Sequence, residues 1–277
     1  MSTKYVIITG STSGIGFETA KDLYLKGYYL ILANRNQQKA LKIKAELTKL
    51  KKVGNIDLLE IDLSSFSSII KFAEEVKITY PKIDILINNA GVFSRTKAYT
   101  KEGYELAKGV NYLGTYYLTE LLLPFMNKQC NSKIIMLSSV GCYYGKINLS
   151  KSFFQQKNND FKDYFDSKLA ALIYTKYIAD KFPNVIIKAA DPGIAYSSIW
   201  KWKSNFGRTF DKLYQSLFSS AKKASRVVVE LADTNKYDKT NHILYKYRKK
   251  RRLPRSVKKF VDVSEFIRIS DECIYNY

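Results

Sequence analysis

A tyrosine and a lysine four positions apart have the residue types and the spacing that proton transfer needs. Tyr164 and Lys168 fall in a segment of helical period, where side chains at i and i+4 share a face one turn apart. Free tyrosine has a pKa of about 10 and is a slow base at neutral pH. An ammonium beside the phenol stabilises the phenolate and lowers that pKa. The pair therefore predicts a general acid for reduction of a carbonyl and a general base for oxidation of an alcohol.

Ser139 and Asn111 are candidates to complete a catalytic set with this pair. Ser139 follows an apolar segment of strand type, 133–137, and its hydroxyl would donate a hydrogen bond to a substrate oxygen as charge develops there. Asn111 lies within a segment of helical period, 104–126. Each residue alone has an ordinary structural explanation, as a turn serine, a helix asparagine or a surface side chain. Their combination in one chain favours catalysis.

A glycine-rich turn with the pattern GxxxGxG follows the first predicted strand, 5–9, and a helical segment begins directly after it at Phe17. Glycine permits a positive φ and lets backbone N–H groups approach a pyrophosphate, whose charge a helix N-terminus favours. The pattern therefore predicts a dinucleotide site, with an ordinary strand-to-helix loop as the alternative. The predicted contacts are Gly10, Ser11, Ser13, Gly14, Ile15 and Gly16.

The end of the second predicted strand, 28–33, bears on the choice of dinucleotide. A carboxylate that selects NAD through its ribose would stand here, and the sequence has Arg35 instead. Arginine offers a fixed cation for a 2′-phosphate, so we expect NADP(H) to be preferred over NAD(H), with a plain surface arginine as the alternative. Asp62 follows the third strand and either accepts a hydrogen bond from the adenine amino group or caps the helix that begins near Ser65.

Short apolar segments alternate with longer segments of helical period along the chain. This alternation predicts an α/β fold: one Rossmann domain over residues 1–277, with a doubly wound parallel sheet and helices on both faces. The predicted strands are 5–9, 28–33, 56–61, 83–87, 133–137, 185–190 and a last one near 242–247. The predicted helices are 17–26, 37–50, 65–80, 104–126, 164–181 and 222–233.

These motifs together resemble those of the short-chain dehydrogenase/reductase family. The TGxxxGIG turn, an NNAG segment at 88–91, Asn111 in NYLG, Ser139, the YxxxK pair and a Pro-Gly pair occur in the family's order. The resemblance spans Tyr5 to about Tyr247, and the sequence from Tyr164 to Phe182 is similar to the retinol dehydrogenase-like branch.

The resemblance implies a nicotinamide-dependent oxidoreductase. It implies that Lys168 also binds the nicotinamide ribose, that the positive nicotinamide ring helps to lower the pKa of Tyr164, and that Asn111 supports a water-linked proton path to Lys168. It adds further cofactor contacts, namely Leu63, Asn89, Ala90, Gly91, Pro192, Gly193 and Ser197.

The sequence departs from that branch on the substrate side. Asp191 stands where the branch often has histidine, which would place an acid near the nicotinamide and disfavour a negatively charged substrate. A lid at about 194–220 is predicted from its aromatic residues and would favour bulky hydrophobic carbonyls or alcohols, with packing on the core as the alternative. These aromatics are Tyr196, Trp200, Trp202, Phe206, Phe210, Tyr214 and Phe218.

Composition narrows the remaining possibilities. The three cysteines lack metal or disulfide spacing and His242 is the single histidine, so we expect free thiols and no metal site. The formal charge of +21 is mostly lysine, and we expect no nucleic-acid partner. The run 246–259 holds nine Lys or Arg and no acid; it is interpreted as a basic surface loop, with weak association with an anionic membrane surface as the alternative.

The sequence therefore predicts an NADP(H)-dependent oxidoreductase acting on the carbonyl or alcohol group of a bulky hydrophobic small molecule. No run reaches the roughly 18 apolar residues of a membrane span and strand-like residues begin at Tyr5, so we expect a cytoplasmic protein with at most peripheral membrane contact. The oligomeric state stays open, a homo-oligomer included. The alternatives are a catalytically idle NADP-binding scaffold or regulatory protein, and a polyanion-binding protein that acts through 246–259.

Overall fold

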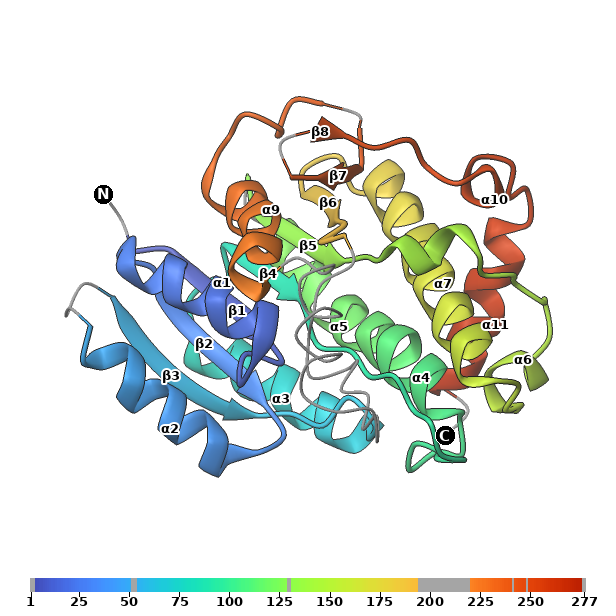
Figure 1. The fold of residues 1–277 in the computed structure, drawn as a ribbon, viewed down its shortest axis with the longest axis horizontal. Helices are drawn as coiled ribbons and strands as arrows, with labels where there is room; N and C mark the ends of the chain where they lie inside the picture. Colours follow the sequence, from blue (N-terminus) through green and yellow to red (C-terminus); the bar gives the residue numbers. More distant parts are fainter. Residues whose placement is uncertain are drawn as a thin grey trace, which may run out of the picture.

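The computed structural model describes residues 3–50, 54–128, 131–193, 220–240, 242–247 and 249–275. Its centre is an eight-stranded sheet in the order β3-β2-β1-β4-β5-β6-β7-β8 (Figure 1). The first seven strands are parallel, and β8 joins the edge antiparallel to β7. The strands are β1 Tyr5–Thr9, β2 Tyr29–Asn34, β3 Asn55–Glu60, β4 Ile85–Asn88, β5 Lys133–Leu137, β6 Ile186–Ala190, β7 Leu244–Lys246 and β8 Lys249–Lys250.

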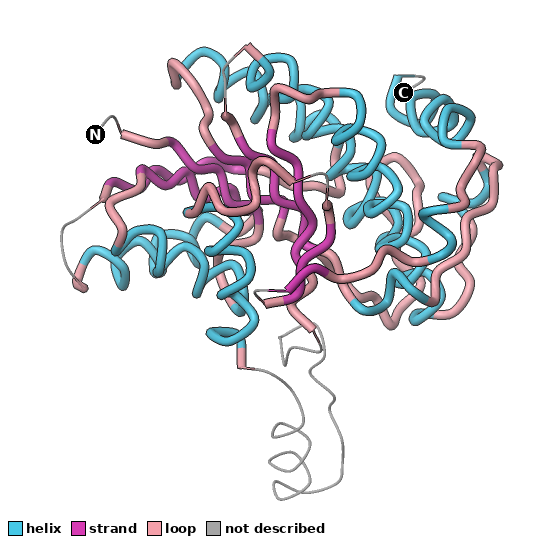
Figure 2. Tube along the Cα trace, turned by 90° about the horizontal axis from the view of Figure 1, so that it is seen from above, coloured by secondary structure: helices cyan, strands magenta, loops and turns pink. Residues whose placement is uncertain are grey.

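Helices cover both faces of the sheet, as Figure 2 shows. The apolar side chains of alternate strand positions point to opposite faces, so each face builds its own core. One core packs under α1 Gly14–Leu25, α2 Gln37–Thr48 and α9 Ala221–Asp233. The other packs under α3 Phe66–Thr79, α5 Thr115–Asn127, α7 Asp160–Lys181 and α11 Val263–Tyr275. The predicted α/β fold with a doubly wound sheet is confirmed.

The strand order places a functional site at one point of the sheet. The chain moves outward through β2 and β3 on one side of β1, and through β4, β5 and β6 on the other. Loops at the carboxyl ends of β1 and β4 therefore diverge to opposite faces and leave a crevice, which is where ligands bind in open sheets of this kind.

Two predicted helices differ from their expected form. The segment predicted as one helix over 104–126 is α4 Leu106–Lys108, a π-helical turn η1 Gly109–Gly114, and α5. The helix that carries Tyr164 begins one turn early, at Asp160, because the Asn159 side chain accepts a hydrogen bond from the Lys162 backbone N–H and caps it. Short turns complete this half of the chain: the 3₁₀ turn η2 Val140–Tyr143 and the helix α6 Ser152–Gln155.

The basic run 246–259 is regular in part, although its charge pattern predicts a loop, and most of its described cations are exposed as that pattern indicates. It contains β8, which pairs with β7, and the short helix α10 Arg255–Lys258. Pro254 and Val257 are buried because α10 packs against α7, and this apolar anchoring orders the run (Figure 1). The predicted lid at 194–220 lies, up to residue 219, outside the described residues, and so does Ser197.

Candidate active site

The predicted dinucleotide turn packs closely against the segment that follows β4. Gly10 has a φ of +66°, and a Cβ there would lie 2.8 Å from the Ala90 Cα. A Cβ at Gly16 would lie 2.3 Å from the Gly10 carbonyl oxygen and 2.4 Å from the Asn89 amide nitrogen. Any side chain at either position would collide with backbone or with a buried amide, so only glycine fits. The turn consequently leaves bare backbone and the N-terminus of α1 facing the crevice.

A cleft of about 420 Å³ opens above this turn, at the crevice between β1 and β4. It is wide enough for part of a dinucleotide, and its floor is the end of β1 with Ala33 and Leu137 from neighbouring strands. Most of the predicted cofactor residues meet here. They are Gly10, Ser13, Gly14, Ile15, Gly16, Arg35, Asp62, Leu63, Asn89, Ala90 and Gly91.

Ser11 does not line the cleft, although the turn motif predicts it as a contact. It is fully buried; its backbone N–H donates to the Asn34 side-chain oxygen at 2.8 Å, and its hydroxyl accepts from the Asn34 amide at 2.8 Å. These two bonds tie the turn to the end of β2. Asn34 thus fixes the glycine turn next to Arg35, a role that sequence reasoning missed.

The far end of the cleft carries positive charge. The Arg35 side chain is 71% exposed, and its guanidinium lies 3.9 Å from the Asp62 carboxylate. Lys39, on the first turn of α2, also lines this end and was missed by sequence reasoning. Of the two roles considered for Asp62, helix capping is wrong, because Ser65 caps α3 and Asp62 accepts from the backbone and hydroxyl of Ser64.

The proton-transfer pair lies next to the cleft, behind its lining residues Gly91 and Leu137. Tyr164 and Lys168 are both buried on α7, with the Lys168 Nζ 5.8 Å from the centre of the phenol ring. The phenol forms a hydrogen bond with the Ser139 side chain. The Lys168 ammonium donates to the carbonyl of Leu137, a residue of the cleft floor, at 3.0 Å. The structure thus brings together three of the four predicted catalytic residues at the carboxyl end of β5.

Burial dominates the ionisation of this pair. It raises the pKa of Tyr164 above its ordinary value, although the hydrogen bond with Ser139 acts in the opposite direction. Burial also lowers the pKa of Lys168 to about 8. Burial therefore opposes the lowering of the phenol pKa that the ammonium and a bound nicotinamide ring together are expected to produce, and that lowering stays a prediction for the cofactor-bound site.

Asn111 lies beside this pair, in the π-helical turn η1. Its side chain accepts from the Val92 N–H at 2.7 Å and donates to the Val92 carbonyl at 2.9 Å and to the Ser167 hydroxyl at 3.0 Å. It therefore clamps the segment after β4 to the helix of Lys168. Because π-helical turns recur at functional sites, this placement agrees with a role in the site, while a proton path through Asn111 stays a prediction.

Asp191 does not present an acid to a substrate. It is fully buried at the end of β6, where one carboxylate oxygen accepts from the Gly193 N–H at 2.8 Å and the other lies 3.2 Å from the Arg251 Nε. The carboxylate is therefore enclosed, and its effect on anionic substrates stays a prediction. Pro192 and Gly193 follow at the same edge of the sheet, next to the loop after β5.

A group of aromatic rings surrounds Tyr164 on the open side and was missed by sequence reasoning. Phe93 meets the Tyr164 ring edge-on at 5.7 Å, and Phe161 lies 5.2 Å from Phe93. Phe165 lies 5.7 Å from Tyr144. Phe161 and Tyr144 are 46% and 68% exposed, so the group forms an apolar surface next to the reacting phenol. The i and i+4 spacing of Phe161 and Phe165 on α7 is visible in the sequence and indicates an aromatic face on this helix.

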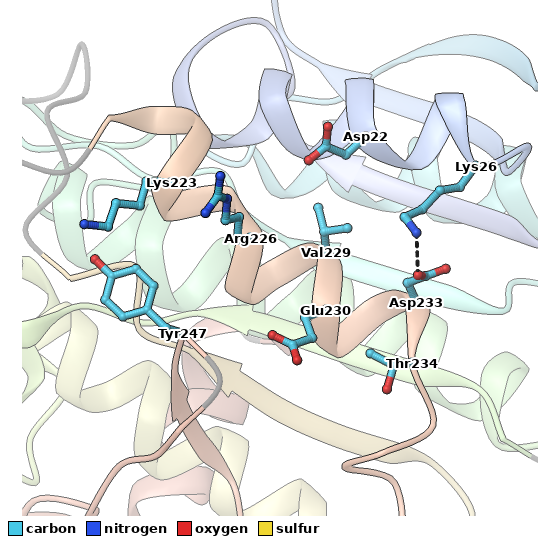
Figure 3. Close-up of a pocket in the computed structure, with 9 residues that line it drawn as sticks. All are labelled: Asp22, Lys26, Lys223, Arg226, Val229, Glu230, Asp233, Thr234 and Tyr247. Atoms are coloured by element: carbon cyan, nitrogen blue, oxygen red, sulfur yellow. Dashed lines mark ion pairs between the residues drawn. The ribbon is translucent and has the colours of Figure 1, made fainter.

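A second hollow of about 730 Å³ lies between α1 and α9 (Figure 3). It is larger than the cleft but carries acids and cations side by side, among them Asp233, which pairs with Lys26 at 2.8 Å. Its charges are compensated from within, and none of the predicted cofactor or catalytic residues lines it. The cleft at β1 and β4 is the better candidate, because it is lined by most of the predicted cofactor residues and by Leu137, whose carbonyl accepts from Lys168.

Comparison with known proteins agrees with this geometry. A sequence model of the family described as short chain dehydrogenase matches residues 4–203. The chain is 33% identical to retinol dehydrogenase 14 of Homo sapiens over 214 residues, covering 72% of this chain and 64% of the relative. It is 30% identical to polyprenol dehydrogenase of Homo sapiens, covering 72% of this chain and 62% of the relative. The matched region spans less than two thirds of each of these relatives.

The fold is shared with solved structures. An uncharacterized protein from Mycobacterium paratuberculosis superposes with a TM-score of 0.78 at 24% identity, covering 99% of this chain and 94% of that one. At this identity the likeness bears on the fold alone, and it agrees with the strand order described above.

Proposed function

The chain belongs to the short-chain dehydrogenase family, in its retinol dehydrogenase-like branch, and we propose that it is an NADP(H)-dependent oxidoreductase that interconverts a carbonyl and an alcohol on a bulky hydrophobic substrate. The observation that carries the proposal is the meeting of Tyr164, Ser139 and Lys168 next to the cleft that the glycine turn lines, with Lys168 bonded to the Leu137 carbonyl of that cleft. The glycine turn, the segment after β4, the end of β5 and the helix α7 all contribute to that arrangement. A purely structural role would not require these four segments to meet.

The cleft fits a nicotinamide dinucleotide. Gly10 and Gly16 leave no room for a side chain and expose backbone N–H groups at the start of α1, where a pyrophosphate is favoured. Arg35 and Lys39 at the far end suit a 2′-phosphate, and this is the basis for proposing NADP(H) over NAD(H). When bound, the cofactor supplies the hydride donor or acceptor.

The side chains next to the cleft move the proton. In carbonyl reduction the Tyr164 hydroxyl donates its proton to the substrate oxygen, and in alcohol oxidation the phenolate takes it back. The raised pKa of Tyr164 keeps the phenol protonated at neutral pH, which suits the reductive direction. The Ser139 hydroxyl donates a hydrogen bond to the same oxygen as charge develops there. The Lys168 ammonium stabilises the phenolate that reduction leaves behind.

The aromatic group beside Tyr164 supports a hydrophobic substrate. Phe161 and Tyr144 offer exposed ring surface, and the partly buried Phe93 and Phe165 connect them to the reacting phenol. Apolar ligand sites are lined in this way, with a few polar groups to fix orientation. We expect long-chain or polycyclic carbonyls to be reduced more efficiently than small polar ones.

The basic run 246–259 supports weak, peripheral contact with an anionic membrane surface. Its exposed cations include Lys249, Lys250, Arg252, Arg255 and Lys258, each worth about 1 kcal/mol near an anionic bilayer. In the part of the chain that the structure describes, no helix combines the length and apolar character needed to cross a membrane. Vesicle binding that falls steeply with salt, and falls further when these cations are neutralised, is the expected result.

Tyr164→Phe tests the proposed function. The variant should lose about a hundredfold or more in NADPH-dependent carbonyl reduction while it retains NADPH affinity, because only the transferable proton is removed. Tyr177→Phe, on the same helix but away from the cleft, serves as the matched control and should keep full activity. A screen over aldehydes, ketones, steroids and retinoids supplies the substrate. NADPH binding by the wild-type chain without turnover of any of these would favour an idle scaffold instead.

A further inference from the structure

Arg251, on the hairpin formed by β7 and β8, reaches across to two segments of the proposed active site. Its Nε donates a hydrogen bond to the Tyr143 hydroxyl at 3.0 Å, and its guanidinium lies 5.0 Å from the centre of the Tyr143 ring. The same Nε forms an ion pair with the Asp191 Oδ2 at 3.2 Å, without a hydrogen bond, because its single proton is donated to Tyr143. Arg251 therefore joins the turn after β5 to the turn after β6.

These two turns hold opposite sides of the site. Tyr143 ends η2, the 3₁₀ turn that Ser139 caps by accepting a hydrogen bond from the Gly141 N–H. Asp191 opens the turn of Pro192 and Gly193, which it closes by accepting from the Gly193 N–H at 2.8 Å. Gly193 has a φ of +75°, so this turn depends on that hydrogen bond for its shape.

The hairpin that carries Arg251 is itself firmly attached. The Arg251 N–H donates to the Leu244 carbonyl at 2.9 Å. The His242 Nε2 lies 2.8 Å from the Leu244 carbonyl and 2.9 Å from the Arg251 carbonyl, two acceptors that require a proton on this nitrogen. The Tyr143 hydroxyl donates in turn to the Arg252 carbonyl. Arg251 is thus presented on a rigid edge of the sheet rather than on a free chain.

We propose that Asp191 and Arg251 are positioning residues, whose ion pair locks the Pro192–Gly193 turn against the Ser139 turn and so sets the spacing between the substrate-oxygen site and the nicotinamide side of the cleft. The inference rests on the proposed function. The proposal gives a role to Asp191, which replaces the histidine that the retinol dehydrogenase-like branch often has at this position. It also gives a role to Arg251, which is part of the basic run.

The pair also governs the charge that Tyr164 experiences. Burial is the main cause that raises the pKa of Tyr164, and the Asp191 carboxylate adds to it. Among the residues that the structure describes, the other ionisable groups facing the phenol are the Cys142 thiol, which burial keeps neutral with a pKa of about 12, and the Lys168 ammonium. Arg251 offsets the Asp191 charge, so its removal should raise the pKa of Tyr164 further, while removal of both charges should restore it.

The test compares Arg251→Gln, Asp191→Asn and the double variant with the wild type. Arg251→Gln leaves a buried, unpaired carboxylate, so we expect kcat for carbonyl reduction to fall by about tenfold to a hundredfold. We expect the alkaline pKa of the pH profile to rise by about one unit. In the double variant asparagine still accepts from Gly193, and we expect kcat and the pH profile to recover much of the wild-type behaviour. Arg251→Lys keeps the charge and should fold even where glutamine does not.

Arg268→Gln is the matched control, because it removes an exposed arginine of α11 that pairs only with helix neighbours. It should leave kcat and the pH profile unchanged. A wild-type profile in Arg251→Gln, or a double variant as impaired as that single variant, would overturn the positioning role. Absence of turnover in the wild-type chain would count against the proposed function alone. In that case the ion pair can be tested directly by measuring the pKa of Tyr164 by NMR of ¹³C-labelled tyrosine, with Tyr164→Phe used to assign the signal.

Discussion

Replacing Lys168 with methionine should stabilise the protein at neutral pH while abolishing turnover. The ammonium is buried, and burial lowers its pKa from 10.5 to about 8. At about 1.4 kcal/mol per pKa unit, that shift corresponds to about 3 kcal/mol of unfavourable free energy for the charged form in the folded state. Methionine removes this penalty but forfeits the hydrogen bond to the Leu137 carbonyl, worth about 1 kcal/mol. The expected net gain is about 2 kcal/mol.

The pH dependence of that gain follows from the direction of the shift. Because the folded-state pKa of Lys168 is depressed, the unfolded chain binds more protons between pH 8 and 10.5, and the wild-type protein recovers stability as pH rises through that window. The advantage of Lys168→Met should therefore be complete below pH 8 and lost by about pH 10.5. Urea unfolding of both proteins at pH 7 and at about pH 10, followed by circular dichroism, measures it.

Two other lysines give matched controls for the same substitution. Lys108 is also buried, but its ammonium lies 2.9 Å from the Asp163 carboxylate and donates to the carbonyls of Phe153 and Gln156, so Lys108→Met should lose about 1 to 3 kcal/mol for each acceptor left unsatisfied. Lys176 is exposed on the same helix as Lys168, and Lys176→Met should change stability by less than about 0.5 kcal/mol. A loss of stability in Lys168→Met comparable to that in Lys108→Met, or a gain that does not change with pH, would refute the reasoning.

Other predictions concern the cofactor and the pH profile. Arg35→Asp should weaken NADPH binding about tenfold or more relative to NADH, and Lys39→Ala should act in the same direction; an unchanged ratio in fluorescence titrations contradicts the 2′-phosphate assignment. Gly16→Ala should abolish NADPH binding, because its Cβ would lie 2.3 Å from a backbone oxygen. The rate of carbonyl reduction should fall in two alkaline steps, the first above about pH 8 as Lys168 loses its charge and the second at the higher pKa of Tyr164, and the residual activity of Lys168→Arg should lack only the first.

The parts of the site that sequence predicts well are those encoded locally. The i and i+4 spacing of Tyr164 and Lys168 is fixed by one helix, and the glycine turn is fixed by one strand and the helix after it. Their relation to Ser139 required only that β5 end at the same edge of the sheet as β4, which parallel pairing ensures. These features are predicted correctly even when the predicted ends of a helix or strand are wrong by one or two residues.

The parts that sequence missed depend on contacts between distant segments. Nothing near Arg251 in the sequence indicates that it meets Asp191, because that contact exists only once β7 pairs with β6 and β8 turns back. The direction of the Tyr164 pKa was missed for the same reason, since spacing shows a neighbouring charge but not the burial that opposes it. The helix α11 is different: its apolar periodicity was available in the sequence and was not used.

The charges around Tyr164 connect the two proposals. The buried lysines Lys108 and Lys133 have carboxylate partners, whereas Lys188 and Lys168 donate to backbone carbonyls. Lys168 forms no ion pair within the described residues, and a carboxylate there would cancel the field by which it stabilises the phenolate. Asp191 opposes that field, and its pairing with Arg251 reduces this effect. The unpaired Lys168 ammonium lowers the stability of the folded protein, and Arg251 is needed to pair with Asp191. Both features keep the electrostatic potential at the Tyr164 phenol positive, which helps it to release and recover its proton.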